Sequence, residues 1–100
     1  MAKNYTKTLK LKFHSDAGHG WLAVKRELIK DLGIADKITP YSYERGQSVY
    51  LEEDCDAALF LETAKAKGLQ FVIENCKPQN YSKIRTYPSY RKDSYLSFLP

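Results

Sequence analysis

Apolar side chains in this chain recur with two different spacings, and the order of these spacings sets the strongest limit on its fold. Residues 7–13 alternate polar and apolar side chains, which is the period of a strand with one buried face. Residues 25–33 and 54–68 carry the spacing of an amphipathic helix, and each stretch ends in a glycine, a residue that often closes helices. Short β-rich runs lie between them. The sequence therefore predicts a single small α+β domain.

The expected order of elements is ββαββαβ, with a mostly antiparallel sheet and two helices that cover one of its faces. Strands are expected at about residues 7–13, 21–24, 41–43, 48–51 and 69–73, and helices at 25–32 and 54–67. The last strand is expected in the centre of the sheet, and Asp54 is expected to cap the second helix. Residues 34–38 are a candidate for one further helical turn. A helix that already begins at Trp21, with Val24 and Leu28 in its apolar stripe, is the alternative to the second strand.

Length and composition admit one hydrophobic core. The chain has 100 residues, of which 43% are hydrophobic, and no apolar run approaches the roughly 20 residues that a membrane span requires. Its first residues contain no apolar signal core. Cys55 and Cys76 allow at most one disulfide, which is too few for a small secreted scaffold. We therefore expect a soluble cytoplasmic protein with reduced thiols and no membrane partner.

The net charge of +4 is distributed unevenly along the chain. Residues 1–33 hold 7 basic and 3 acidic side chains, residues 34–76 hold 4 and 8, and residues 77–100 hold 5 and 1. The three segments thus carry +4, −4 and +4. Positive charge belongs to the two ends, so attraction to nucleic acid is not expected to be uniform over the surface.

Residues 1–76 are expected to form the core domain, and residues 77–100 a basic, tyrosine-rich C-terminal arm that is partly ordered, with one short strand near residues 83–87. Basic and aromatic side chains interleave in this arm at Tyr81, Lys83, Arg85, Tyr87, Tyr90 and Arg91. Lysine and arginine neutralise phosphates and tyrosine stacks on unpaired bases, so these residues are candidates for binding single-stranded nucleic acid or a nucleotide. The alternative is that the tyrosines are partly buried or face a protein partner.

The stretch FHSDAGHGWLAV, residues 13–24, holds both histidines and the single tryptophan. A connection from residue 14 to residue 20 is longer than a hairpin needs, so Asp16, His19 and Trp21 are predicted to form a recognition loop. On the next hairpin, Tyr43 and Arg45 are further candidates for binding. Tyr41 shares a strand face with Tyr43, which is either the core or an aromatic binding surface.

Metal binding or covalent catalysis would require four side chains to converge, namely His14, His19, Glu53 and Cys55. Their spacing matches no strong metal signature. Gly18 and Gly20 would cradle a phosphate only if a helix began directly after them. We therefore expect no catalytic residue, no metal site and no cofactor.

The segments DAGHGWLAV, ELIKDLGI, ITPYSYERG and YLEEDCDA resemble a small protein family of bacteriophages, prophages and other mobile elements for which no activity is established. The resemblance covers about residues 11–61, with a looser similarity at KIRTYPSY. Lys25 departs from the pattern, which has a proline near this position, so the boundary between strand and helix stays open.

The resemblance implies no catalytic role for any residue. It does suggest a protein that acts stoichiometrically. Together with the small size of the chain, its lack of a catalytic signature and its polar–aromatic segments, this leads us to expect a small non-enzymatic binding protein in the cytoplasm of a host cell, acting on a host or defence protein or on its nucleic-acid complex. The residues themselves offer two alternatives. One is a binder of single-stranded nucleic acid or a nucleotide signal through the arm, and the other is a metal- or cysteine-dependent hydrolase.

Overall fold

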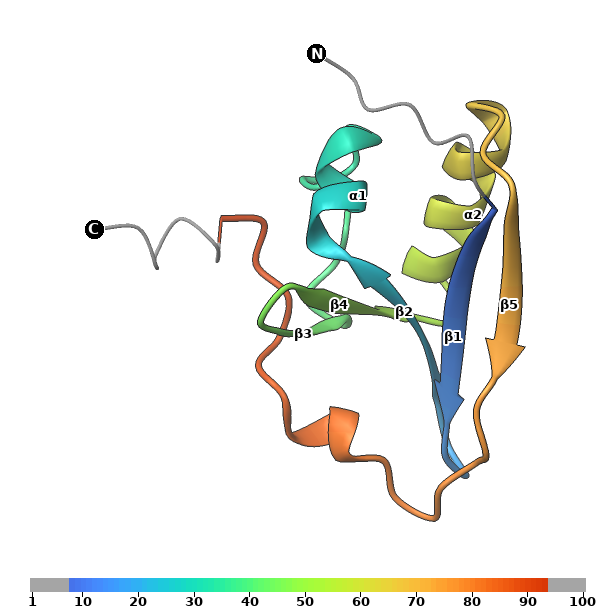
Figure 1. Cartoon of the computed structure of the whole chain (residues 1–100). Helices are drawn as coiled ribbons and strands as arrows, with labels where there is room; N and C mark the ends of the chain where they lie inside the picture. Colours follow the sequence, from blue (N-terminus) through green and yellow to red (C-terminus); the bar gives the residue numbers. More distant parts are fainter. Residues whose placement is uncertain (1–7, 94–100) are drawn as a thin grey trace.

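In the computed structural model, which describes residues 8–93, five strands form one mixed sheet with two helices beside it (Figure 1). The elements are β1 (Leu9–Ser15), β2 (Gly20–Lys25), α1 (Arg26–Asp31), β3 (Tyr43–Arg45), β4 (Ser48–Glu52), α2 (Asp56–Ala66), β5 (Phe71–Asn75) and the 3₁₀ helix η1 (Lys83–Thr86). The predicted α+β class and the order ββαββαβ are confirmed. Residues 94–100 of the predicted arm lie outside the described residues.

The strands are arranged in the order β3-β4-β2-β1-β5. Three neighbouring pairs are antiparallel, and only β1 and β5 are parallel, because α2 carries the chain across the sheet between β4 and β5. The prediction that β5 is central is wrong, since it lies at the edge. Its run of adjacent apolar residues is the pattern of a strand that is buried on both faces. In the structure, however, Val72 is 53% exposed and Ile73 is 41% exposed.

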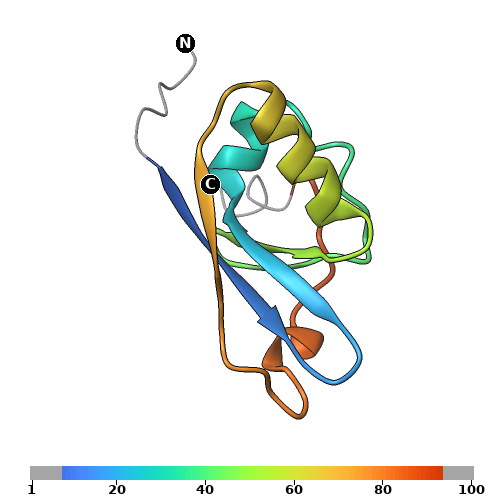
Figure 2. The ribbon, with the colours of Figure 1, turned by 90° about the vertical axis from the view of Figure 1, so that its right-hand side faces the viewer.

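The two faces of the sheet have different cover. Side chains of one face, which we call the helix face, form the core together with both helices, and Figure 2 shows α1 and α2 on the same side of the sheet. The largest members of this core include Leu22, Leu51, Ile29 and Phe60, each at most 1% exposed. The opposite face, which we call the arm face, carries the alternate residues of each strand and is crossed by the described part of the arm, residues 77–93.

The second predicted strand is present as β2, and the alternative of a helix that begins at Trp21 is wrong. Leu22 and Val24 join the helix-face core, whereas Trp21 lies on the arm face, which is the alternation of a strand. Pairing between β1 and β2 continues to Ser15 and Gly20, so the connecting loop is only residues 16–19. The long recognition loop that the sequence predicted is therefore a short hairpin loop. A side chain at Gly20 would collide with the ring of Phe13, which explains the glycine there.

Both helices end as predicted, at glycines with positive φ, Gly33 (+75°) and Gly68 (+78°). The segment after α1 differs from the expectation of another helical turn. Residues 35–37 form a single turn in which the Lys37 amide donates to the Ile34 carbonyl at 2.9 Å. Burial of Ile34 and Ile38 in the core holds this segment against the helices.

Asp54 does not cap α2, because the helix begins two residues later and its N-cap, Cys55, makes no side-chain cap hydrogen bond. The carboxylate that matters is Asp56, which is 1% exposed. Its Oδ2 accepts hydrogen bonds from the Thr39 amide at 3.0 Å, the Thr39 hydroxyl at 2.7 Å and the Ser42 hydroxyl at 2.6 Å. Ser42 Oγ in turn accepts from the Glu52 amide at 2.9 Å. Asp56 therefore fixes the segment before β3 to both α2 and β4.

We expect Asp56→Ala to lower the free energy of unfolding by about 3 kcal/mol, because three donors lose a charged acceptor in a largely buried setting. Asp54→Ala is the matched control and should change it by less than about 0.5 kcal/mol, as for an exposed residue. Urea denaturation followed by circular dichroism measures both. Equal effects of the two substitutions would contradict the roles assigned here.

Candidate functional site

The described part of the arm follows the edge of the sheet and then crosses the arm face (Figure 1). Amides of Cys76 and Gln79 donate to carbonyls of Phe13 and Ser15, each at 2.9 Å. Farther on, Ser89 forms an antiparallel bridge with Tyr43. The short strand expected near residues 83–87 is wrong. The chain there forms η1, started by the Ser82 hydroxyl, which accepts from the Ile84 amide at 3.2 Å.

Asp16 is the point where the β1–β2 loop and the arm are joined. Its Oδ2 accepts from Arg85 Nε at 2.5 Å and from the Ser82 amide at 2.9 Å, and its Oδ1 accepts from Arg85 Nη2 at 2.8 Å. Oδ1 also accepts from the amides of Gly18 and His19, both at 3.1 Å. The Asp16 side chain is 1% exposed. The Arg85 guanidinium and these amides hold the pKa of the Asp16 carboxyl well below its usual range, and Asp16 raises the pKa of Arg85.

Aromatic rings surround the Arg85 guanidinium. Its carbon lies 5.5 Å from the centroid of Trp21 and 5.4 Å from that of Tyr81. Nη2 also lies 2.8 Å from His19 Nδ1, and the His19 ring stacks on Trp21 with centroids 6.0 Å apart. The charge of Arg85 is thus compensated by Asp16 within the protein. This arginine organises the arm face and is a poor ligand for an external phosphate.

A second aromatic group lies on the same face, over β4. The rings of Tyr50 and Tyr87 have centroids 5.3 Å apart, and the Arg45 guanidinium lies 5.3 Å from the Tyr87 centroid. Arg45 Nη1 donates to the Tyr87 hydroxyl at 3.3 Å. His14 meets the edge of Tyr50, with centroids 6.1 Å apart. Burial raises the pKa of Tyr50, and burial followed by nearby Lys12 lowers the pKa of His14, so the histidine favours its neutral form.

Four exposed basic side chains share the arm face with these rings. Strand register places them there, because paired residues point to the same face of a sheet. Ser48 is paired with both Lys25 and Arg45, and Ala23 is paired with both Lys12 and Tyr50. Lys10 lies two residues before Lys12 in β1 and points to the same face. We call this set the basic cluster: Lys10, Lys12, Lys25 and Arg45. Two acidic strand residues lie on the same face, Glu52 beside Trp21 and Glu74 beside Lys12. The sheet itself therefore gives the arm face an excess of positive charge.

Most of the residues predicted for binding come together on the arm face or at its edge: Asp16, His19, Trp21, Tyr43, Arg45, Tyr81, Arg85 and Tyr87. Lys83 is exposed in η1. Two others lie elsewhere. Tyr90 is buried in the helix-face core and its hydroxyl donates to the Ala35 carbonyl at 2.6 Å, while Arg91 contacts Glu44 through its amide and Asp93 through its side chain.

Sequence reasoning missed Lys10, Lys12, Lys25 and Tyr50 as site residues. The alternation in residues 7–13 places Lys10 and Lys12 on the outer face of a strand, as the structure confirms, but it does not give their neighbours across the sheet. The sequence signal that could have identified them is their position at every second residue in β1, β2 and β4, which places them all on one face of the sheet. It becomes informative only when the strand order is known.

The four side chains considered for metal or covalent chemistry do not form a cluster. Among residues 8–93 no group of three or more histidine, cysteine, aspartate or glutamate residues is arranged to hold a metal ion. Both cysteines are free thiols, with Cys55 exposed at the start of α2. Gly18 lies in the β1–β2 loop and Gly20 is the first residue of β2, so the helix start needed for a phosphate cradle is absent there.

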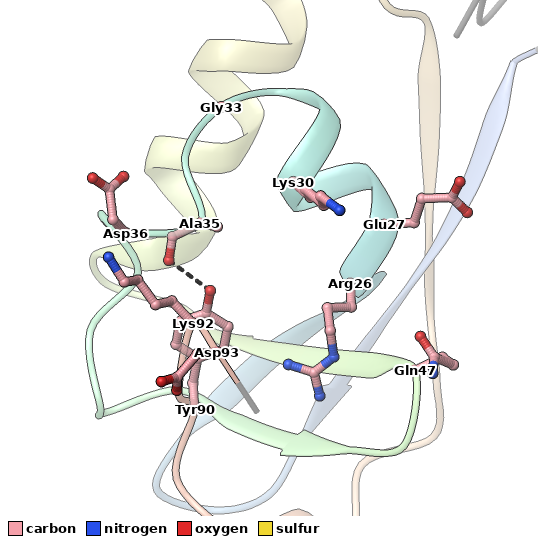
Figure 3. A pocket seen from close by; sticks show the side chains of 10 residues that line it. All are labelled: Arg26, Glu27, Lys30, Gly33, Ala35, Asp36, Gln47, Tyr90, Lys92 and Asp93. Atoms are coloured by element: carbon pink, nitrogen blue, oxygen red, sulfur yellow. Dashed lines mark hydrogen bonds between the residues drawn. The ribbon is translucent and has the colours of Figure 1, made fainter. Parts of the chain in front are cut away.

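A cleft of about 610 Å³ lies on the other side of the arm, between α1 and residues 90–93 (Figure 3). Its charged lining is balanced, with Arg26, Lys30 and Lys92 against Glu27, Asp36 and Asp93. The Arg26 guanidinium is turned toward the β3–β4 hairpin, where it donates to Glu44 Oε1 at 3.0 Å and to the Gly46 carbonyl at 2.8 Å. Its Nε is buried and has no hydrogen-bond partner. This cleft therefore shows no preference for a charged ligand.

No family model, no curated protein and no solved structure matches this chain. Within residues 8–93, no helix is long and apolar enough to cross a membrane. Functional proposals for this chain therefore rest on the chemistry of its own residues, above all those of the arm face.

The Asp16 carboxylate should make the free energy of unfolding depend on pH in the acid range. Its pKa in the folded state lies below the unfolded value of about 4, so its contribution is complete above about pH 4 and is lost as the pH falls toward the folded-state pKa. In Asp16→Asn, the free energy of unfolding should be lower at pH 7 and should fall less steeply between about pH 4 and pH 2. Urea titrations across this range measure the slope. Asp93→Asn, which alters an exposed pair, should keep the wild-type slope.

Proposed function

We propose that this protein is a binding module for single-stranded nucleic acid and that the arm face is its binding surface. The observation that carries the proposal is the placement of the basic cluster on the same sheet face as the rings of Tyr50 and Tyr87. Ammonium and guanidinium groups neutralise phosphates, and aromatic rings on an open sheet stack with unpaired bases. A duplex would present its bases only at their edges, so a single strand fits this surface better.

The roles within this site differ from those expected for the arm alone. Arg85 is engaged with Asp16 on both carboxylate oxygens, so the phosphate contacts are assigned to the exposed lysines of β1 and β2. Tyr81 is 67% exposed and already supports Arg85 with one face of its ring, which leaves its other face for a base. The arm supplies rings and the sheet supplies most of the charge.

Residues 77–93 are part of the fold as well as of the site, because Tyr90 is in the core and Ser82 and Arg85 hold Asp16. Removal of the arm would thus damage both. Point substitutions in the basic cluster separate binding from folding, since these side chains are exposed.

A protein partner is the second candidate function, in keeping with the stoichiometric role expected from the mobile-element resemblance. One observation favours it. Tyrosine, tryptophan and arginine are the residues enriched in the centres of protein interfaces, and they gather on the arm face around Tyr41, which is 77% exposed. A nucleoprotein complex of the host would satisfy both candidates. No catalytic step is part of either proposal.

Binding of fluorescein-labelled single-stranded DNA and RNA oligonucleotides, followed by anisotropy at several salt concentrations, tests the nucleic-acid function. In Lys10→Gln/Lys12→Gln, the loss of two phosphate contacts should reduce the slope of log K against log salt by about 1.4 and weaken binding about 25-fold at 0.1 M salt. The matched control is Lys65→Gln/Lys67→Gln at the end of α2, which changes the net charge equally. This control should bind within about twofold of the wild type.

Two results would contradict the proposal. Equal weakening by both lysine pairs would show attraction by net charge without a defined surface. Absence of salt-dependent binding by the wild type would remove the nucleic-acid function and leave the protein partner as the remaining candidate.

A further inference from the structure

A second cleft opens on the arm face, away from the basic cluster, and its chemistry is different. It has a volume of about 700 Å³ and lies where the segment before β3, the end of β4, the β1–β2 loop and the arm meet. Its lining includes Tyr41, Tyr43 and Trp21 together with the carboxylates of Glu52 and Asp54. Such a cleft joins ring surface to negative charge in a chain whose net charge is +4.

The aromatic part of this cleft is held in place before any ligand arrives. The Tyr41 amide donates to Thr39 Oγ1 at 3.2 Å, and Thr39 and Ser42 on either side are both bound to buried Asp56. The phenol of Tyr41 nevertheless extends into solvent and is 77% exposed. A large ring kept outside the core on a fixed segment loses little conformational entropy on binding.

The floor of the cleft is formed by Trp21 and Tyr43, whose centroids lie 6.3 Å apart in an edge-to-face contact. Trp21 is 1% exposed and is already covered by His19 and Arg85. The accessible aromatic surface therefore belongs mainly to the two tyrosines. Tyrosine faces attract cations, and do so more strongly where water is excluded.

The charge of the cleft is negative when its ion pair is taken into account. Arg85 lines the cleft but is compensated by Asp16. Glu52 and Asp54 both line the cleft. Glu52 Oε1 accepts a hydrogen bond from the Asp54 amide at 2.6 Å, which holds the Glu52 carboxylate at the end of β4. A ligand in this cleft thus meets tyrosine rings and two carboxylates without a competing free cation from Arg85.

We infer that this cleft binds an arginine side chain from a partner protein, with the guanidinium against Tyr41 and Tyr43 and directed toward Glu52 and Asp54. Arginine suits this lining because its planar group stacks on rings and donates two parallel hydrogen bonds to a carboxylate. A nucleotide fits less well, since its phosphate would approach two negative charges. The inference is independent of nucleic-acid binding by the basic cluster, because the two surfaces have opposite charge.

Titration of the ¹⁵N-labelled protein with N-acetyl-arginine-N-methylamide, followed by two-dimensional NMR, tests the inference. The indole signal of Trp21 reports directly on the cleft because the chain contains a single tryptophan. We expect a saturable shift of this signal at millimolar ligand. The citrulline analogue has nearly the same shape without charge, and it should bind at least about tenfold more weakly.

Variants locate the site. Glu52→Gln keeps an oxygen that accepts from the Asp54 amide, so it preserves the fold while it should weaken arginine binding at least about fivefold. Tyr41→Ala should weaken it to a similar extent. Glu74→Gln, which removes one negative charge from the opposite edge of the arm face, is the control and should leave the affinity unchanged.

Three outcomes would overturn the inference. The citrulline and arginine probes have nearly the same shape and differ in charge, so equal affinities would exclude a guanidinium site. Unchanged arginine affinity in Glu52→Gln would place binding elsewhere. A saturable shift with guanosine monophosphate and none with the arginine probe would assign the cleft to a nucleobase. None of these outcomes depends on whether Lys10 and Lys12 bind an oligonucleotide.

Discussion

The contact between Asp16 and Arg85 joins two segments that are 69 residues apart, and the arrangement of the arm face depends on it. Asp16 lies in a four-residue hairpin loop, and Arg85 lies in a single turn of 3₁₀ helix. Neither segment has much structure of its own. Their charged hydrogen bonds, with those from the amides of Ser82, Gly18 and His19, satisfy both carboxylate oxygens and place the arm on the sheet.

One consequence of this contact is the burial of Trp21. The indole lies on the sheet face that has no helix, yet it is 1% exposed because Arg85, His19 and Tyr43 cover it. Farther along the same strand, the one exposed side chain is that of Lys25, which is charged. The arm thus closes one half of the arm face with aromatic contacts and leaves the lysine-bearing half open, which is the division on which the proposed nucleic-acid surface rests.

Local pattern was sufficient to find the five strands and two helices, but it predicted a strand where η1 forms, and it did not predict the pairing across the sheet. Alternation identified β1, and glycines marked the ends of both helices, because these signals depend on a few neighbouring residues. The edge position of β5 and the contacts of Asp56 depend on segments distant in sequence. Asp56 has the appearance of a helix-cap residue in the sequence, and only the fold shows that its partners are Thr39 and Ser42.

The candidate site shows the same limit. Residue type alone identifies Asp16, Arg85 and the surrounding rings as candidate site residues, whereas Lys10 and Lys12 become candidates only through the strand order. Folding also rearranges the charge pattern of the chain. The basic first segment and the basic arm meet on the arm face, and part of the acidic middle segment, Glu52 and Asp54, reaches the same face at one cleft. Because positive and negative surfaces lie side by side there, a partner that offers phosphates next to basic side chains would complement both, which is the chemistry of a protein bound to nucleic acid.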